Sequence, residues 1–119
     1  MNPHFFTVPV RVVSSSSSGY ELIFDFASIE VAYSNAVILY QLVEAPPNTQ
    51  LGVPISNKPG PFDTFVAFNG MLAGMMDTDT DTDSASTTYQ ITLTAIVTES
   101  SGPTLVTSDP QVINNPIKR

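Results

Sequence analysis

The chain has 119 residues, with four Lys and Arg against eleven Asp and Glu and a formal net charge of −7. Four cations are too few to neutralise a stretch of phosphates, so this balance argues against general nucleic-acid binding. The complete lack of cysteine excludes disulfide frameworks and thiolate chemistry. Because 42% of the residues are hydrophobic, the chain can build a core, and its length fits one domain.

The amino-acid sequence shows no membrane-spanning segment and no targeting signal. The longest uninterrupted apolar run covers residues 36–40, far short of the roughly 18 residues that span a bilayer as a helix. The start of the chain has two prolines, Pro3 and Pro9, where a secretory signal would have a continuous apolar run. We therefore expect neither a signal peptide nor a membrane span.

The first part of the chain alternates apolar and polar residues with the period of a β-strand. Val8, Val10 and Val12 share one face, and the pattern resumes at residues 20–26 after a Ser/Gly segment at residues 14–19. Two matched strands around such a segment predict a β-hairpin. Pro9 lacks an N–H group, which favours an edge position for the first strand.

The middle of the chain predicts a central strand followed by a long connection. Residues 29–33 continue the alternation, whereas residues 37–43 are apolar on both faces, as in a strand that is covered on both sides. Residues 44–61 are rich in proline and leave room for one short strand near residues 51–55.

The second half of the chain predicts another hairpin and one long strand. Residues 62–68 alternate, and Asn69 and Gly70 supply the two positive-φ positions of a type I′ turn into residues 71–76. Residues 89–97 give the cleanest alternation in the chain. The segments around Val106 and at residues 112–113 are flanked by proline, so we expect short edge strands or an extended arm there.

These elements predict an all-β fold, an antiparallel β-sandwich of the immunoglobulin-like or jelly-roll type with seven to nine short strands. We expect a single domain over residues 1–119, with residues 1–5 and 108–119 as extended termini and residues 77–87 as an acidic loop. Ser and Thr occupy many outward strand positions where Lys and Glu are usual. Faces with so little charge are poorly protected against association, which suggests that a partner covers them.

The acidic loop carries four carboxylates at two-residue spacing, on Asp77, Asp79, Asp81 and Asp83. Alternate side chains of an extended strand lie about 6.7 Å apart, so the run could share one calcium ion only by curling into a loop. An EF-hand frame fails, because its glycine and its final glutamate are missing. A calcium site and a solvated hairpin tip are both compatible with the run, and no other cofactor is indicated.

The sequence offers few residues that could act in catalysis. His4 is the only imidazole and lies at the very start of the chain. Without a second histidine, a cysteine or a nucleophile elbow, serine and cysteine triads cannot form. A carboxylate pair for glycoside hydrolysis stays open, but a sandwich of 119 residues rarely encloses an active-site cleft. The carboxylates that could converge are Glu21, Asp25, Glu30, Glu44, Asp63 and Glu99. We therefore predict that the protein is not an enzyme.

Two segments are candidates for contacts with other subunits. One is a soft apolar cluster that contains Met71, Leu72, Met75 and Met76, for which core filling is the alternative. The other is the end of the chain, Ile117, Lys118 and Arg119, where two cations follow a strongly acidic body. Such an arm could lie across an acidic neighbour, and a frayed tail is the alternative.

Together these features predict a non-enzymatic structural protein that associates with itself or with other structural proteins. The most plausible setting is a virion, as a capsid decoration, spike or fibre protein. The alternative is a calcium-dependent, adhesin-like or carbohydrate-binding β-sandwich module at a cell surface or in the extracellular space.

Overall fold

The computed structural model describes residues 4–15, 19–32, 35–57, 60, 62–78 and 86–115. Within these ranges no helix is long and apolar enough to cross a membrane. The same ranges contain eleven β-strands: β1 (His4–Ser15), β2 (Gly19–Phe24), β3 (Ser28–Val31), β4 (Ala36–Glu44), β5 (Thr49–Leu51), β6 (Ile55–Ser56), β7 (Phe62–Ala67), β8 (Leu72–Asp77), β9 (Thr87–Glu99), β10 (Gly102–Ser108) and β11 (Gln111–Asn114).

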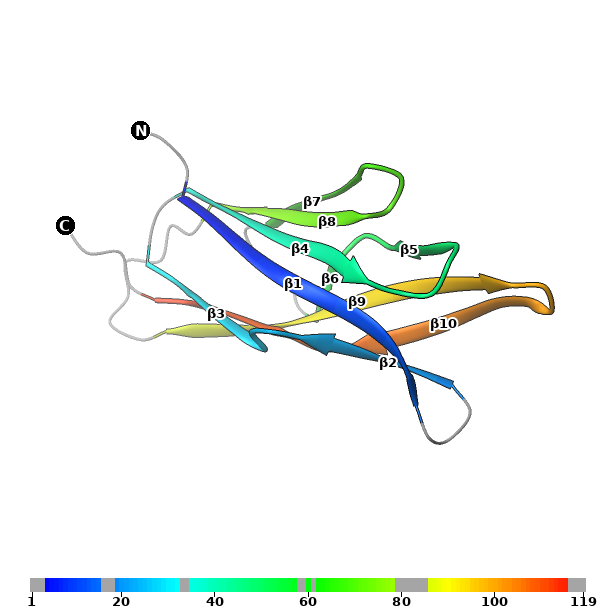
Figure 1. Ribbon diagram of the computed structural model, residues 1–119. Helices are drawn as coiled ribbons and strands as arrows, with labels where there is room; N and C mark the ends of the chain where they lie inside the picture. Colours follow the sequence, from blue (N-terminus) through cyan, green and yellow to red (C-terminus); the bar gives the residue numbers. More distant parts are fainter. Residues whose placement is uncertain are drawn as a thin grey trace.

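The strands form two sheets that pack face to face, so the predicted all-β sandwich is confirmed (Figure 1). The first sheet has five strands in the order β2-β1-β4-β8-β7, and the second has six, in the order β10-β9-β11-β3 with β5 and β6 on the free side of β9. The strand number exceeds seven to nine partly because the proline-rich connection forms two very short strands, β5 and β6, instead of one.

Both sheets are mixed, whereas the sequence predicted purely antiparallel pairing. β1 lies parallel to β4, and β11 lies parallel to β3. The chain leaves the first sheet after β2, crosses to the second sheet as β3, and returns as β4 on the far side of β1. This crossing brings β4 back in the direction of β1, which a simple hairpin cannot do.

The expected edge position of Pro9 is wrong. β1 lies between β2 and β4, and its ladder with β2 ends at the pair of Val10 and Phe24. Beyond that pair the carbonyl of Pro9 still accepts a hydrogen bond from the Asp25 N–H, at 3.1 Å. The ring nitrogen faces the same side, so the missing N–H removes only the other bond of this last pair, at the point where the ladder with β2 ends.

The C-terminal strand is also placed differently from the prediction. Residues 111–114 form β11, which lies inside the second sheet between β9 and β3 instead of at its edge or in an extended arm. Pro110 falls in the break between β10 and β11, where its carbonyl accepts a hydrogen bond from Ile91. Because the proline interrupts the chain before β11 begins, both sides of β11 are free to pair.

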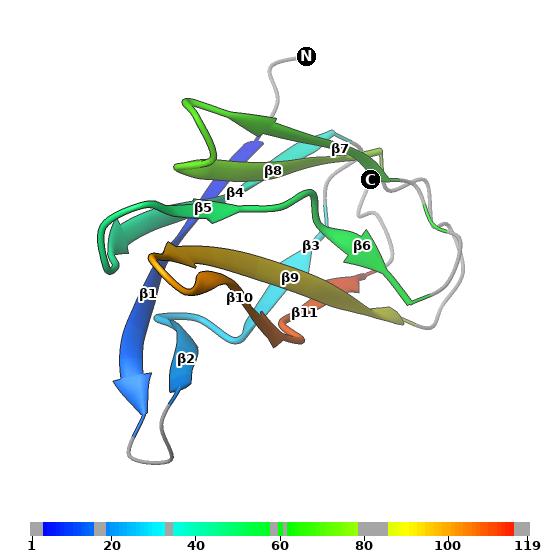
Figure 2. The same ribbon diagram turned by 90° about the vertical axis from the view of Figure 1, so that its right-hand side faces the viewer.

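The core lies between the two sheets and is built by the inward-facing residues of each strand. The longest inward series come from β1 and β9, in which apolar residues alternate with outward ones. On one side β2 contacts β10, and on the other the β5 and β6 segment lies between β8 and β9 (Figure 2). The core side chains include Val8, Val10, Val12, Ile38, Tyr40, Met75, Ile91, Leu93, Ala95 and Val97.

Candidate interaction surface

The outward surface of the five-stranded sheet is almost uncharged and mostly apolar over four of its strands, β1, β4, β8 and β7. Residues that pair directly across neighbouring strands point to the same face, so β1, β4, β8 and β7 present three aligned rows. We call these twelve residues the outer face; among them only Asp63 is ionisable. The rows are Phe5, Val37, Met76 and Asp63; Thr7, Leu39, Gly74 and Phe65; and Pro9, Gln41, Leu72 and Ala67.

The opposite surface of the sandwich has a different character. The outward residues of β9 alternate with the buried Ile91, Leu93, Ala95 and Val97, and they are mainly threonine and glutamine. Threonine and glutamine side chains form hydrogen bonds with water, so this surface is suited to solvent. The outward residues of β9 are Thr88, Gln90, Thr92, Thr94, Ile96 and Thr98. The sequence pointed to these Thr-rich positions as the covered ones, but the apolar surface lies on the other sheet.

A strained turn holds an aromatic side chain at one end of the outer face. Asn69 and Gly70 have φ angles of 53° and 82°, and the Met71 N–H donates to the Phe68 carbonyl at 3.1 Å, so the predicted turn between β7 and β8 is confirmed. Phe68 itself has a φ of 55°, a backbone conformation that bulky residues rarely adopt. Its side chain is 76% exposed.

A groove of about 370 Å³ lies beside this turn. Its lining includes Leu39, Gln41 and Leu72 of the outer face together with Phe68 and Met71, and it contains no ionisable side chain. A second hollow of about 280 Å³ shares Leu42 and Met71 with it. The complete lining of the groove is Thr7, Leu39, Gln41, Leu42, Phe68, Met71 and Leu72.

Phe65 covers a gap in the middle row of the outer face. Gly74 has no side chain, and the ring of its partner Phe65 lies over it: a Cβ atom at position 74 would come within 2.3 Å of the Phe65 Cζ atom. An aromatic ring that covers a cross-strand glycine restores the packing that the glycine lacks. The outer face is therefore a continuous surface over Gly74.

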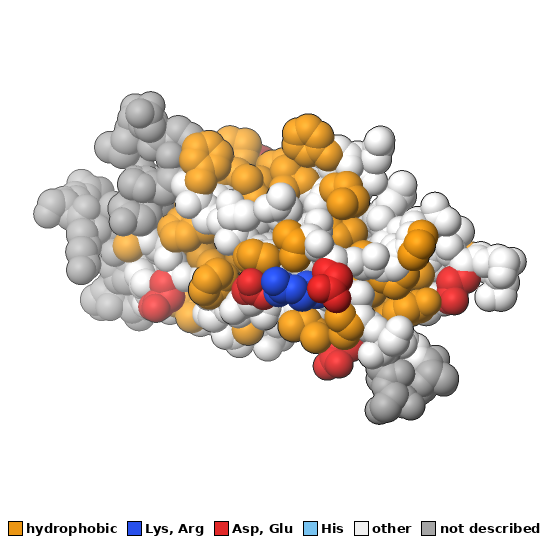
Figure 3. Space-filling model, viewed as in Figure 1, with side chains coloured by type: hydrophobic (Ala, Val, Ile, Leu, Met, Phe, Trp, Pro, Cys, Tyr) orange, Lys and Arg blue, Asp and Glu red, His pale blue; other side chains and the backbone are white. Residues whose placement is uncertain are grey.

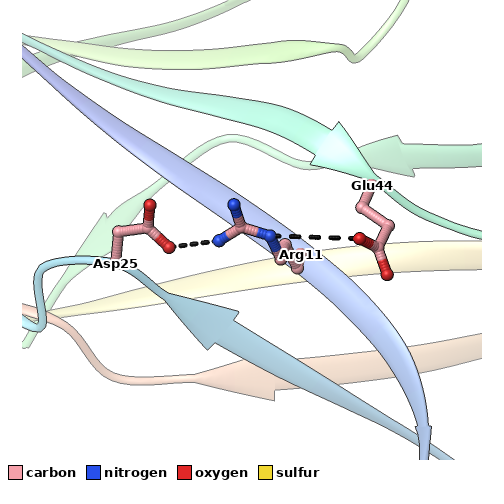
Figure 4. A network of polar contacts seen from close by, with 3 residues as sticks. All are labelled: Arg11, Asp25 and Glu44. Carbon is pink, nitrogen blue, oxygen red and sulfur yellow. Dashed lines mark hydrogen bonds and ion pairs between the residues drawn. The ribbon is translucent and has the colours of Figure 1, made fainter.

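Beyond the three rows, one cluster of charges marks the border of the outer face. Arg11, the only Lys or Arg among the described residues, donates to the Asp25 carboxylate, and its Nε lies 4.0 Å from the Glu44 Oε1 (Figure 4). In Figure 3 this single cation lies between two acidic groups, with hydrophobic side chains over the sheet above it. The cluster links β1 to β4 and to the end of β2, and it leaves no unneutralised positive charge for an anion.

The predicted contact cluster divides between the two sides of β8. Met71, Leu72 and Met76 belong to the turn and the outer face, but Met75 is 0% exposed in the core, so its assignment as an interaction residue is wrong. Neighbouring residues of a strand point to opposite faces, which separates Met75 from Met76. Ile117, Lys118 and Arg119 lie outside the described residues. The sequence prediction missed Phe5, Leu39 and Phe68. The alternation of apolar and polar residues could have shown that Phe5 and Leu39 point outward from their strands.

Only the first member of the aspartate run can be placed. Asp77 is the last residue of β8, not part of a loop, and is 0% exposed; its Oδ1 accepts a hydrogen bond of 3.2 Å from the Asn114 Nδ2. This buried contact joins the two sheets. Asp79, Asp81 and Asp83 lie outside the described residues, and within the described part of the chain no three His, Asp or Glu side chains converge on a metal position.

Two tyrosines have a raised pKa. Burial raises the pKa of Tyr40 well above its ordinary value of 10.0, and its hydroxyl has no hydrogen-bond partner in the described structure. Desolvation raises the pKa of Tyr20, and the carboxylate of Glu99, which is hydrogen-bonded to its hydroxyl, adds to the effect. Neither group is placed for proton transfer near neutral pH, because both stay protonated there.

Comparison with known proteins assigns no family. No protein-family model matches the chain, and no curated protein matches its sequence.

Proposed function

We propose that the protein is a non-enzymatic structural module that assembles by burying its outer face against another subunit. The observation that carries this proposal is the contrast between the two surfaces of the sandwich. β9 in the second sheet presents mainly threonine to solvent, with Ile55 and Leu105 as exposed apolar residues on neighbouring strands, whereas the first sheet presents three continuous rows of mostly apolar residues with one ionisable group. Apolar patches of a few hundred Å² with a polar border are typical of contact sites.

The central strand of the first sheet supports the same proposal. β4 is apolar on both faces, as expected of a strand covered on both sides, and its inward residues pack in the core. Of its outward residues Val37 is only 9% exposed, Leu39 is half-buried and Gln41 is exposed, and none of the described strands packs over them. An external subunit on the outer face would give β4 its second cover.

A virion, the setting that the sequence favours, is part of the proposal. A capsid decoration, spike or fibre protein functions through subunit contacts and needs no catalytic groups. A contact face with a single ionisable side chain suits a protein whose working state is an assembly, because charged residues are depleted at the core of interfaces.

Methionine oxidation tests the proposal, because the chain has two exposed methionines at the outer face and a buried one beside them that serves as a control. Met71 and Met76 are 46% and 41% exposed, while Met75 is buried between them. Dilute purified protein treated with hydrogen peroxide should form sulfoxide at Met71 and Met76 and not at Met75, since oxidation follows exposure. In the native assembly both should be protected, as quantified by peptide mass spectrometry. Equal oxidation of Met71 and Met76 in the free and the assembled protein would refute the proposal.

A further inference from the structure

We infer that the subunit covering the outer face is a second copy of the same chain, packed face to face about a twofold axis with Phe68 of each copy in the groove of the other. This inference rests on the proposed function and names the partner.

The first argument is the shape of the surface. An isologous dimer needs a surface that is complementary to itself, since the same patch serves on both subunits. Phe68 projects from the turn between β7 and β8 and forms part of the wall of the groove, together with Leu39, Met71 and Leu72. An apolar cavity of about 150 Å³ accommodates a benzene molecule. The groove, at about 370 Å³, has room for one aromatic ring.

The second argument is charge. Two copies with a formal charge of −7 each repel one another, so a contact between them should use the part of the surface that carries little charge. The groove lining contains no ionisable residue, and the three rows of the outer face contain only Asp63. The outer face is thus where two acidic copies can meet with one carboxylate each, Asp63, in the row farthest from the groove.

The third argument is area. Four strands about 4.8 Å apart with three rows about 6.7 Å apart cover roughly 400 Å² of flat sheet. The exposed side chains of Phe68 and Met71 extend this area at one end. Two sets of rows give roughly 800 Å², so the side chains at the turn must supply the remainder of the roughly 1,000 Å² that a specific interface needs.

The fourth argument is the strain at Phe68. A bulky residue at a φ of 55° is strained, and such strain is concentrated at functional sites. Asparagine adopts this conformation more readily, as Asn69 does next to it. An aromatic ring at this position does not bury itself in its own subunit, which fits a role in contact with another one.

Sedimentation velocity on the purified protein, from nanomolar to high micromolar concentration, tests this inference. The wild type should convert from monomer to dimer and stop there, because a twofold contact is closed. Phe68→Asn should weaken dimerisation at least about 30-fold, as for a central aromatic anchor, while its thermal melting stays the same or improves. Phe26→Asn is the matched control: Phe26 is another exposed phenylalanine, 56% exposed in the segment after β2, and its loss should leave the dimer intact.

The oxidation of Met71 and Met76 in the same concentration series separates this inference from the proposed function. If Met71 and Met76 become protected from oxidation as the concentration of the purified protein rises, with no other component present, the second copy is supported. Protection in the native assembly together with a monomeric purified protein overturns the second copy and leaves the proposed function standing. An oligomer in which Phe68→Asn has no effect while Met71 stays exposed overturns the second copy, and exposure of both methionines in the native assembly as well overturns the proposed function too.

Discussion

The replacement of Tyr40 by phenylalanine should stabilise the protein. Tyr40 is 0% exposed, its ring packs edge-on against Phe24 at a centroid distance of 6.0 Å, and its hydroxyl has no hydrogen-bond partner in the described structure. An unsatisfied buried hydroxyl costs about 1–3 kcal/mol, and phenylalanine removes this cost while keeping the ring. The small void left by the oxygen offsets part of the gain.

We expect Tyr40→Phe to raise the free energy of unfolding by about 0.5–2 kcal/mol, or Tm by roughly 2–8 °C for a domain of this size. Tyr20→Phe is the matched control, because its hydroxyl is bonded to Glu99 and its loss removes an interaction. Thermal unfolding followed by circular dichroism gives both values. A Tm that falls by several degrees in Tyr40→Phe would refute the reasoning, since the hydroxyl would then have a partner such as an ordered water.

The same tyrosine predicts the behaviour of the protein at high pH. Burial raises the pKa of Tyr40 in the folded state above its ordinary value of 10.0, so the folded state keeps this proton longer than the unfolded chain. The contribution of Tyr40 to stability is therefore complete below pH 10 and is lost as the pH rises above it. Urea unfolding at alkaline pH should show a smaller loss of stability in Tyr40→Phe than in the wild type; equal losses would contradict the assignment.

Three further substitutions test the fold around the outer face. Gly70→Ala should destabilise by about 2–4 kcal/mol in chemical denaturation, because φ is 82° and a Cβ atom would lie 2.6 Å from the Gln50 Cβ atom; a loss below 1 kcal/mol would contradict this turn. Asn114→Ala should cost about 2–3 kcal/mol and loosen β11 in hydrogen exchange, since Asp77 loses a buried hydrogen bond; unchanged exchange in β11 would refute the link between the sheets. Arg11→Gln should cost less than about 1 kcal/mol in the same denaturation assay, because its ion pairs are partly exposed; a larger loss would show that the cluster supports the sheet.

Local patterns predicted most of the strands. The alternation in residues 6–12 and 89–97 corresponds to β1 and β9, and the Asn69-Gly70 pair lies at the turn between β7 and β8. Such signals are local, since they depend on the period of a strand and on the φ angles of a turn.

The pairing between distant strands could not be predicted in the same way. The position of β4 beside β1, and of β11 between β9 and β3, depends on which strands meet after the chain crosses between sheets. Pro9 lies in an inner strand because the β2 ladder ends beside it. The residues around Pro9 do not show where the neighbouring strand β2 ends, so its position in the sheet could not be predicted from them.

The candidate surface was predicted in part. The sequence picked out Met71, Leu72 and Met76, but it grouped them with Met75 because neighbours in the sequence look like one cluster until the strand separates its two faces. The outer face also needs Phe5 and Leu39, which come from strands far apart in the chain. Only the register between these strands shows that they form one surface.

Nuclear magnetic resonance of side-chain methyl groups, in a dilution series of the purified protein, tests the central claim most directly. Ile55 and Leu105 serve as controls, because they are 63% and 66% exposed but lie off the outer face. We predict that the methyl signals of Leu39, Met71 and Leu72 shift with concentration while those of the two controls stay fixed. Shifts at Ile55 and Leu105 without shifts at Leu39 and Leu72 would contradict the account.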